Sequence, residues 1–169
     1  MKRQSFKTAF FALAFGLGLS SCQNNPTTLS KQIDRLKRQV VSDSVTLHQI
    51  KTFDYQNLKS DFIVCDSMLQ YVAQDQIEVA FESLNLTQAY LHQFGQVQPI
   101  MSKKIRYALI QLDHLKADVE SHYLTDSIAL VYLNDESLIA DTLHNQVVYF
   151  KDRFAQCQKD LNTFKKNHK

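Results

Sequence analysis

The chain has 169 residues, of which 44% are hydrophobic and 21% are charged, and it contains only 3 glycines and 2 prolines. At roughly 150 residues per domain, this length indicates a single domain. The scarcity of glycine and proline argues against loop-rich, sandwich and collagen-like designs. The formal net charge of +2 lacks the basic surplus of a nucleic-acid-binding surface, so we expect no nucleic-acid partner.

The first 21 residues have the layout of an export signal. Residues 1–7 carry three basic residues and no acid, and residues 9–19 (AFFALAFGLGL) form an apolar run. A bilayer-spanning helix needs about 20 apolar residues, so this run is too short to span. A basic start followed by about 7–15 apolar residues is typical of a secretory signal peptide.

The apolar run ends in Leu19-Ser20-Ser21-Cys22. This ending resembles the lipobox of bacterial lipoproteins, in which an aliphatic residue and two small residues precede a lipidated cysteine. The resemblance implies cleavage before Cys22, diacylglycerol on its sulfur and acylation of its new amino group, including palmitate as an acyl chain. The alternative is an uncleaved secretory signal with a chance cysteine. The lipobox divides the chain into a signal peptide at 1–21, a lipidated tether at 22–28 and a helical domain at 29–169.

The residues that follow Cys22 bear on the location of the anchored protein. Residue 23 is Gln, and not the Asp associated with inner-membrane retention in enterobacterial-type lipoproteins. No acidic cluster follows in QNNPTT, so the surface-export signal of some Bacteroidota lipoproteins is missing. The resemblance therefore implies the outer membrane, facing the periplasm. The overall resemblance extends only to the lipoprotein class, and it suggests small helical lipoproteins of unknown function from Bacteroidota-like bacteria.

Hydrophobic spacing predicts an all-α fold for the mature chain. Apolar residues recur at alternating steps of three and four, and the longest unbroken series runs from Ala140 to Phe164. This spacing is that of a helix, whereas a strand shows a period of two. Gly95 and Pro99, the only glycine and proline after Pro26, lie close together and predict a turn at 95–99.

Weaker breaks fall at 51–55 and 123–126, where threonine and aspartate residues suit helix starts. Helices joined by short loops pack antiparallel, so we expect an elongated antiparallel helical bundle, or a coiled-coil hairpin if neither break forms. Residues 128–143 have a β-hairpin as the alternative. With both breaks, the predicted helices are four: 29–51, 55–94, 99–122 and 126–166.

Two cysteines remain if Cys22 carries lipid. Cys65 and Cys157 are an even pair in an exported chain, a setting in which disulfides persist. A two-helix hairpin folded at 95–99 would separate them by about 40 Å, whereas a four-helix bundle allows contact. The pair is therefore either a disulfide or two buried thiols that act as small apolar residues.

Other candidate chemistry is sparse. His114, Asp118 and His122 share one helical stripe, which suits either a transition metal or a solvated polar face. Asp141 and His144 resemble half of a di-iron motif, but a second copy is lacking. With one glycine after the signal, a phosphate loop and a nucleophile elbow are nearly excluded, so we expect no enzyme activity and no cofactor.

These features predict a membrane-anchored envelope lipoprotein with a non-catalytic structural, spacer or protein-binding role. Its partners would be the bilayer, through acylated Cys22, and another envelope protein or a second copy through helix seams. The alternative is a periplasmic carrier with a small apolar ligand or a metal in the bundle core. That alternative places Phe81, Phe150 and Phe154 around the ligand, or His114 and His122 on the metal.

Overall fold

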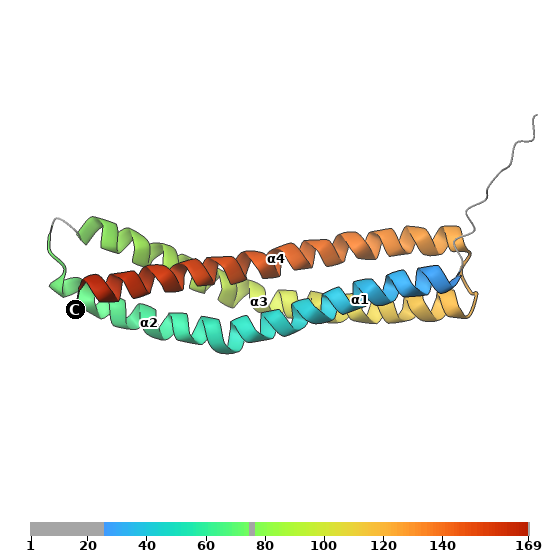
Figure 1. Cartoon of the computed structure of the whole chain (residues 1–169), viewed down its shortest axis with the longest axis horizontal. Coiled ribbons are helices and arrows are strands. Elements are labelled where there is room, and N and C mark those ends of the chain that lie inside the picture. The colour runs from blue at the N-terminus through green and yellow to red at the C-terminus, as the bar shows by residue number, and fades with distance from the viewer. Residues whose placement is uncertain (1–25, 75–76, 169) are drawn as a thin grey trace, which may run out of the picture.

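The computed structural model describes residues 26–74 and 77–168, which form three long helical segments packed side by side as an elongated rod (Figure 1). No strand occurs in these residues, which confirms the all-α prediction, whereas the prediction of four helices is wrong. The first segment combines α1 (Pro26–Gln49), the π-helical turn η1 (Ile50–Asp54), α2 (Tyr55–Met68) and the 3-10 turn η2 (Leu69–Tyr71). The other two are α3 (Ile77–Glu120) and α4 (Asp126–Asn167).

The three segments alternate in direction along the rod (Figure 1). α1 and α2 run one way, α3 runs back, and α4 runs parallel to α1. α1 therefore begins beside the turn at 121–125, and we call this the proximal end. η2, the start of α3 and the end of α4 lie together at the opposite end, which we call the distal end.

The predicted turn at 95–99 is wrong, because Gly95 and Pro99 lie inside α3. Pro99 has no N–H to donate to the carbonyl of Gly95, four residues earlier, and its ring crowds that carbonyl. The helix nevertheless continues, because Phe94 and Met101 on either side are both buried in the same core. Tertiary packing along one apolar face outweighs the local preference of these two residues.

The two weaker breaks have different outcomes. At 51–55 the chain stays helical through η1, and the Thr52 hydroxyl donates back to the His48 carbonyl at 2.8 Å instead of capping a new helix. At 123–126 the break is confirmed, since α3 ends at Glu120 and α4 begins at Asp126. α4 is continuous through 128–143, so the β-hairpin alternative is wrong.

α3 ends in a Schellman motif, although the sequence has no glycine at this point. The Tyr123 N–H donates to the Asp118 carbonyl at 2.9 Å, and the His122 N–H donates to the Val119 carbonyl at 3.2 Å. His122 has a φ of 56°, the left-handed conformation that glycine adopts most easily at this position. A search for glycine at helix ends therefore misses this turn. It also misses the connection after η2, where Val72 is extended and the local sequence VAQDQ lacks glycine and proline.

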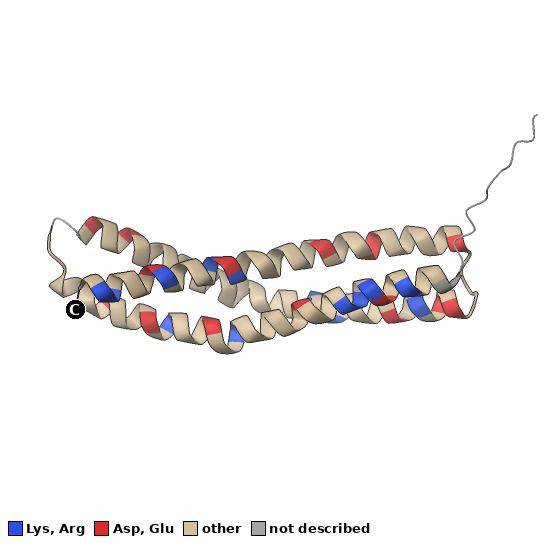
Figure 2. Cartoon of the chain, viewed as in Figure 1, with Lys and Arg blue, Asp and Glu red and all other residues tan. Residues whose placement is uncertain are grey.

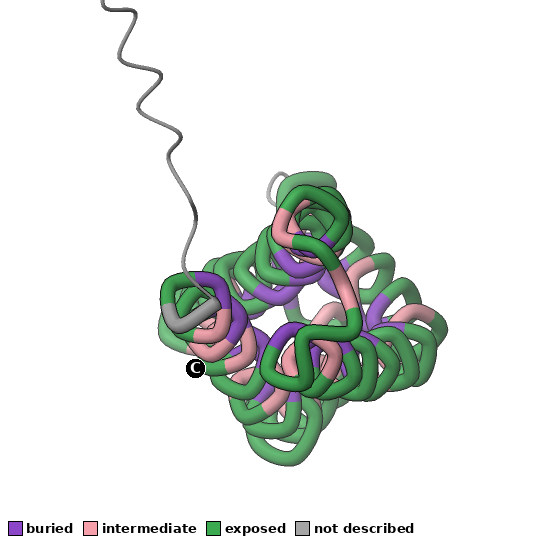
Figure 3. Tube along the Cα trace, turned by 90° about the vertical axis from the view of Figure 1, so that its right-hand side faces the viewer, coloured by how far each residue is buried: buried purple, intermediate pink, exposed green. Residues whose placement is uncertain are grey.

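The core follows the predicted helical spacing in α4. Every position of the series from Ala140 to Phe164 is buried, and the buried positions of all segments face the interior (Figure 3). Near the start of α3, Ala80 and Leu84 are buried, whereas the larger Ile77 and Phe81 are exposed. α1 begins at Pro26, so the last residues of the predicted tether at 22–28 are helical.

Candidate functional site

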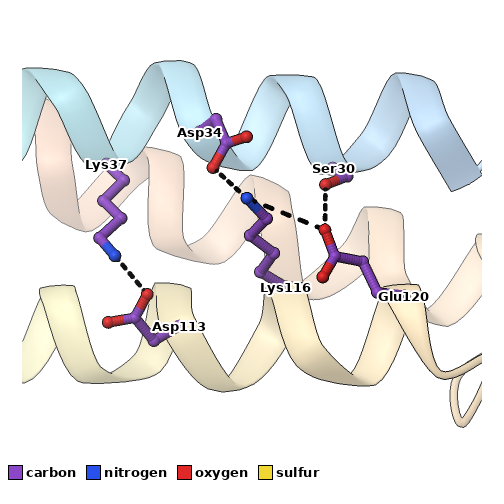
Figure 4. Close-up of polar contacts among 6 residues, drawn as sticks. All are labelled: Ser30, Asp34, Lys37, Asp113, Lys116 and Glu120. Atoms are coloured by element: carbon purple, nitrogen blue, oxygen red, sulfur yellow. Dashed lines mark hydrogen bonds and ion pairs between the residues drawn. The ribbon is translucent and has the colours of Figure 1, made fainter.

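α1 and α3 meet near the proximal end through a row of polar contacts (Figure 4). Moving along α1, each partner lies earlier along α3, as an antiparallel register requires. The Ser30 hydroxyl donates to Glu120 Oε1 at 2.8 Å, and Lys116 Nζ donates to Asp34 Oδ1 at 2.7 Å. One turn farther, Lys37 pairs with Asp113. The six residues of this row are Ser30, Asp34, Lys37, Asp113, Lys116 and Glu120.

The polar row helps to set the register of α1 against α3, but it adds little to the stability of the fold. The hydrogen bond from Lys116 lowers the pKa of Asp34, and the same bond raises the pKa of Lys116. Both side chains remain partly open to solvent. Exposed ion pairs contribute little free energy, because water and salt screen them. They do disfavour slipped pairings of α1 on α3, in which like charges would meet.

α1 meets α4 through a buried carboxylate. Asp43 is 4% exposed, and its Oδ1 lies 2.8 Å from Nδ1 of His144, while its Oδ2 is buried without a hydrogen-bond partner. One turn earlier, Gln39 Nε2 donates to Asp141 Oδ1 at 3.3 Å. Asp141 and His144 thus contact α1, and the half-motif read in the sequence serves helix pairing.

Asp43 is a buried polar residue that the predictions above do not include, although its position in the sequence carries a signal. The core residues Leu36, Val40, Leu47 and Ile50 leave one vacant position in their three-and-four spacing, and Asp43 occupies it. Glu136 fills an equivalent position in α4, between Leu133 and Ala140. A carboxylate at a core register position needs a partner, because an unpaired buried charge is costly.

Four aromatic rings pack together near the middle of the rod. Phe94 of α3 lies 5.4 Å from Tyr55, 5.1 Å from Phe150 and 5.0 Å from Phe154, measured between ring centroids. These rings occupy the space in which a carrier would hold an apolar ligand. Phe81 is 54% exposed and lies outside this cluster, so the prediction that it lines a core cavity is wrong.

Both remaining cysteines are buried free thiols. Cys65 Sγ lies 3.7 Å from the Leu161 carbonyl, and Cys157 lies beside the hydroxyl of Thr87. Burial raises the pKa of each thiol. A thiol with a raised pKa holds little reactive thiolate, so both cysteines have the character of small core residues.

The predicted histidine stripe does not form a straight line of ligands. α3 ends at Glu120, so His122 lies in the turn and leaves the helical register shared by His114 and Asp118. In the part of the chain that the structure describes, no three histidine, cysteine or acidic side chains gather closely enough to hold a metal ion.

An apolar groove runs between α3 and α4 on the outside of the rod. Tyr107 and Gln111 line it from α3, and Leu138 and Ile139 line it from α4. Glu136 also lines the groove, and burial raises the pKa of its carboxyl, with a smaller contribution from the nearby Asp135. Its Oε2 is buried without a hydrogen-bond partner. The groove thus combines apolar walls with a carboxyl that resists ionisation.

The predicted lipidation site, Cys22, lies outside the described residues. Among the helices of residues 26–74 and 77–168, none has an apolar stretch of the length needed to cross a bilayer. No family model matches this chain, and no curated protein or solved structure is detectably similar to it.

Proposed function

We propose that the chain is a lipid-anchored, non-catalytic lipoprotein of the bacterial cell envelope whose antiparallel helical bundle serves as a spacer. Cys22 precedes the start of α1 by four residues, so an acyl anchor there attaches at the proximal end. α3 alone has 44 residues and spans about 66 Å. A rod of this length holds its distal end well away from the membrane that carries its proximal end.

The lipobox resemblance supports the anchor and the location. Each buried CH₂ of an acyl chain contributes about 0.8 kcal/mol of membrane affinity, so several chains on Cys22 would hold the protein firmly. Gln23 and the absence of an acidic cluster in QNNPTT favour the periplasmic face of the outer membrane.

The roles of the polar side chains support a structural function over catalysis. Asp141 and His144, which the sequence offered as candidate ligands, bind side chains of α1. Phe150 and Phe154 pack against Phe94. A carrier or an enzyme would need these side chains to be free to contact a ligand or substrate, and here they contact neighbouring helices. We therefore prefer the spacer to the carrier.

The anchor is tested by labelling the full-length protein with a palmitate analogue in a bacterial host that processes lipoproteins. We expect label on the wild-type chain and none on Cys22→Ser. Cys65→Ser is the matched control, because it removes a different cysteine and should keep the label. Label that persists on Cys22→Ser would overturn the proposed anchor.

The spacer role is tested with a photo-crosslinking residue in place of Tyr71, which is 77% exposed near the distal end. In whole cells we expect adducts with another envelope protein from this position and none from position 103, midway along α3. Adducts that form only from position 103 would show that the partner binds the side of the rod, and the spacer role would be abandoned.

A further inference from the structure

The proximal end carries an exposed aliphatic and aromatic surface. Tyr123, in the turn between α3 and α4, is 81% exposed. Ile128, Val131 and Tyr132, in the first two turns of α4, are also exposed. We call these four residues the proximal tip.

The proximal tip lies beside the start of α1. The hydrogen bond from Ser30 to Glu120 brings the beginning of α1 to the end of α3, and Figures 1 and 3 show the 121–125 turn at the same end as the start of α1. Tyr132 is six residues into α4, so the tip extends about 9 Å along the rod.

The chain between Cys22 and Pro26 is short. Four residues span at most about 14 Å when fully extended. Acyl chains on Cys22 would therefore keep the start of α1, and the proximal tip beside it, within reach of the lipid headgroups. The distal end also exposes apolar side chains, including Tyr71 and Val79, so the tether decides which end faces the bilayer.

The chemistry of the proximal tip suits the membrane interface. Tyrosine is enriched where headgroups meet hydrocarbon, because its ring is apolar and its hydroxyl is polar. Asp118, Glu120 and Asp126 lie close to the proximal tip in the sequence, and the nearby Lys116 is already paired with Asp34 and Glu120. Figure 2 shows basic and acidic residues mixed near this end of the rod, with no purely basic surface that would attract anionic lipid. Contact with the bilayer would thus depend on apolar and aromatic burial.

We propose that the proximal tip inserts into the interfacial layer of the bilayer that holds Cys22. This inference rests on the proposed lipid anchor and adds a second membrane contact to it. The rod would then contact the membrane through the proximal tip as well as through the acyl chains. These two contacts would restrict its tilt and direct the distal end away from the bilayer.

The chain contains no tryptophan, so a single introduced tryptophan reports its own surroundings. Tyr123→Trp places this probe in the proximal tip, and Tyr71→Trp places it in an equally exposed position near the distal end. Each full-length, acylated protein is reconstituted in vesicles of phosphatidylcholine and phosphatidylethanolamine, with and without brominated acyl chains. We expect at least about twofold quenching and a blue shift for Tyr123→Trp, and neither change for Tyr71→Trp.

Equal quenching of the two variants, in protein that carries acyl label, would overturn the proximal-tip contact and leave the lipid anchor standing. Absence of acyl label on the wild-type chain would overturn the anchor and this inference together. Quenching that disappears in about 1 M salt, where charges are screened beyond about 3 Å, would overturn the apolar basis of the contact. Val131→Asp in the Tyr123→Trp background should reduce the quenching, with helix content checked by circular dichroism.

Discussion

The proximal and distal halves of the rod are held together by different means. In the proximal half, α1 is an uninterrupted helix that carries the polar row toward α3 and the buried Asp43 carboxyl, paired with His144, toward α4. In the distal half, α2 lies between η1 and η2, and aromatic rings and cysteines fill the core. Polar pairs between helices are thus more numerous in the proximal half, whereas the distal half combines the Lys165–Asp61 ion pair with a core of aromatic rings and cysteines.

The aromatic cluster provides the most severe test of this comparison. Phe94 is 1% exposed and touches three other rings, so Phe94→Ala should leave a cavity and cost about 3–5 kcal/mol of unfolding free energy. Urea unfolding followed by circular dichroism measures the change. The exposed Phe81→Ala is the matched control and should change stability by less than about 0.5 kcal/mol. Similar losses in the two variants would show that volume does not organise the distal half.

The Asp43–His144 pair tests the proximal half. His144→Ala should cost about 2 kcal/mol, because it leaves the buried Asp43 carboxylate without its partner. Adding Asp43→Leu to that variant should recover most of the loss, since the unpaired charge is then removed. The double-mutant cycle, measured by urea unfolding, gives the coupling directly. Additive losses would mean that the two side chains act independently.

Pro99 lies where the two halves meet. Pro99→Ala should raise the unfolding free energy by about 1 kcal/mol, because the new N–H can donate to the Gly95 carbonyl and the ring no longer crowds it. Part of the gain is offset by the greater freedom of alanine in the unfolded chain. Thermal unfolding measures the shift, with Lys103→Ala as an exposed control. A loss of stability would indicate that the proline shapes α3 in a way that packing requires.

Acid should weaken the ion pairs of both halves, with the smallest effect of the four. Hydrogen bonding from Lys165 lowers the pKa of Asp61 in the distal half, as Lys116 lowers the pKa of Asp34 in the proximal half. A carboxyl with a lowered folded-state pKa adds stability above its ordinary pKa of 3.8, and this stability is lost as the pH falls through the lowered value. Asp61→Asn should therefore reduce the difference in urea midpoint between pH 7 and pH 3. An unchanged difference would contradict the pairing.

Some features of the fold could be predicted from local sequence patterns and others could not, as the following residues show. The series from Ala140 to Phe164 was predicted as a core seam and is buried throughout. Gly95 and Pro99 were predicted to form a turn, but buried neighbours on both sides keep α3 helical. In the turn after α3, His122 adopts the left-handed conformation. Glycine is the usual sequence signal for this conformation, and no glycine occurs there. Asp43 occupied a core position in the spacing, but its partner lies 101 residues away, and local patterns do not identify such pairs.

The helical character of the chain and most of its apolar faces can be read from the sequence, because a spacing of three and four residues is a local property of the helix. The ends of the helices and the side-chain pairs between them depend on long-range packing. Interrupting a helix would remove packing contacts with the neighbouring helices. A side-chain pair between two helices forms only when their register brings the two residues together. Both are set by contacts that no short stretch of sequence contains.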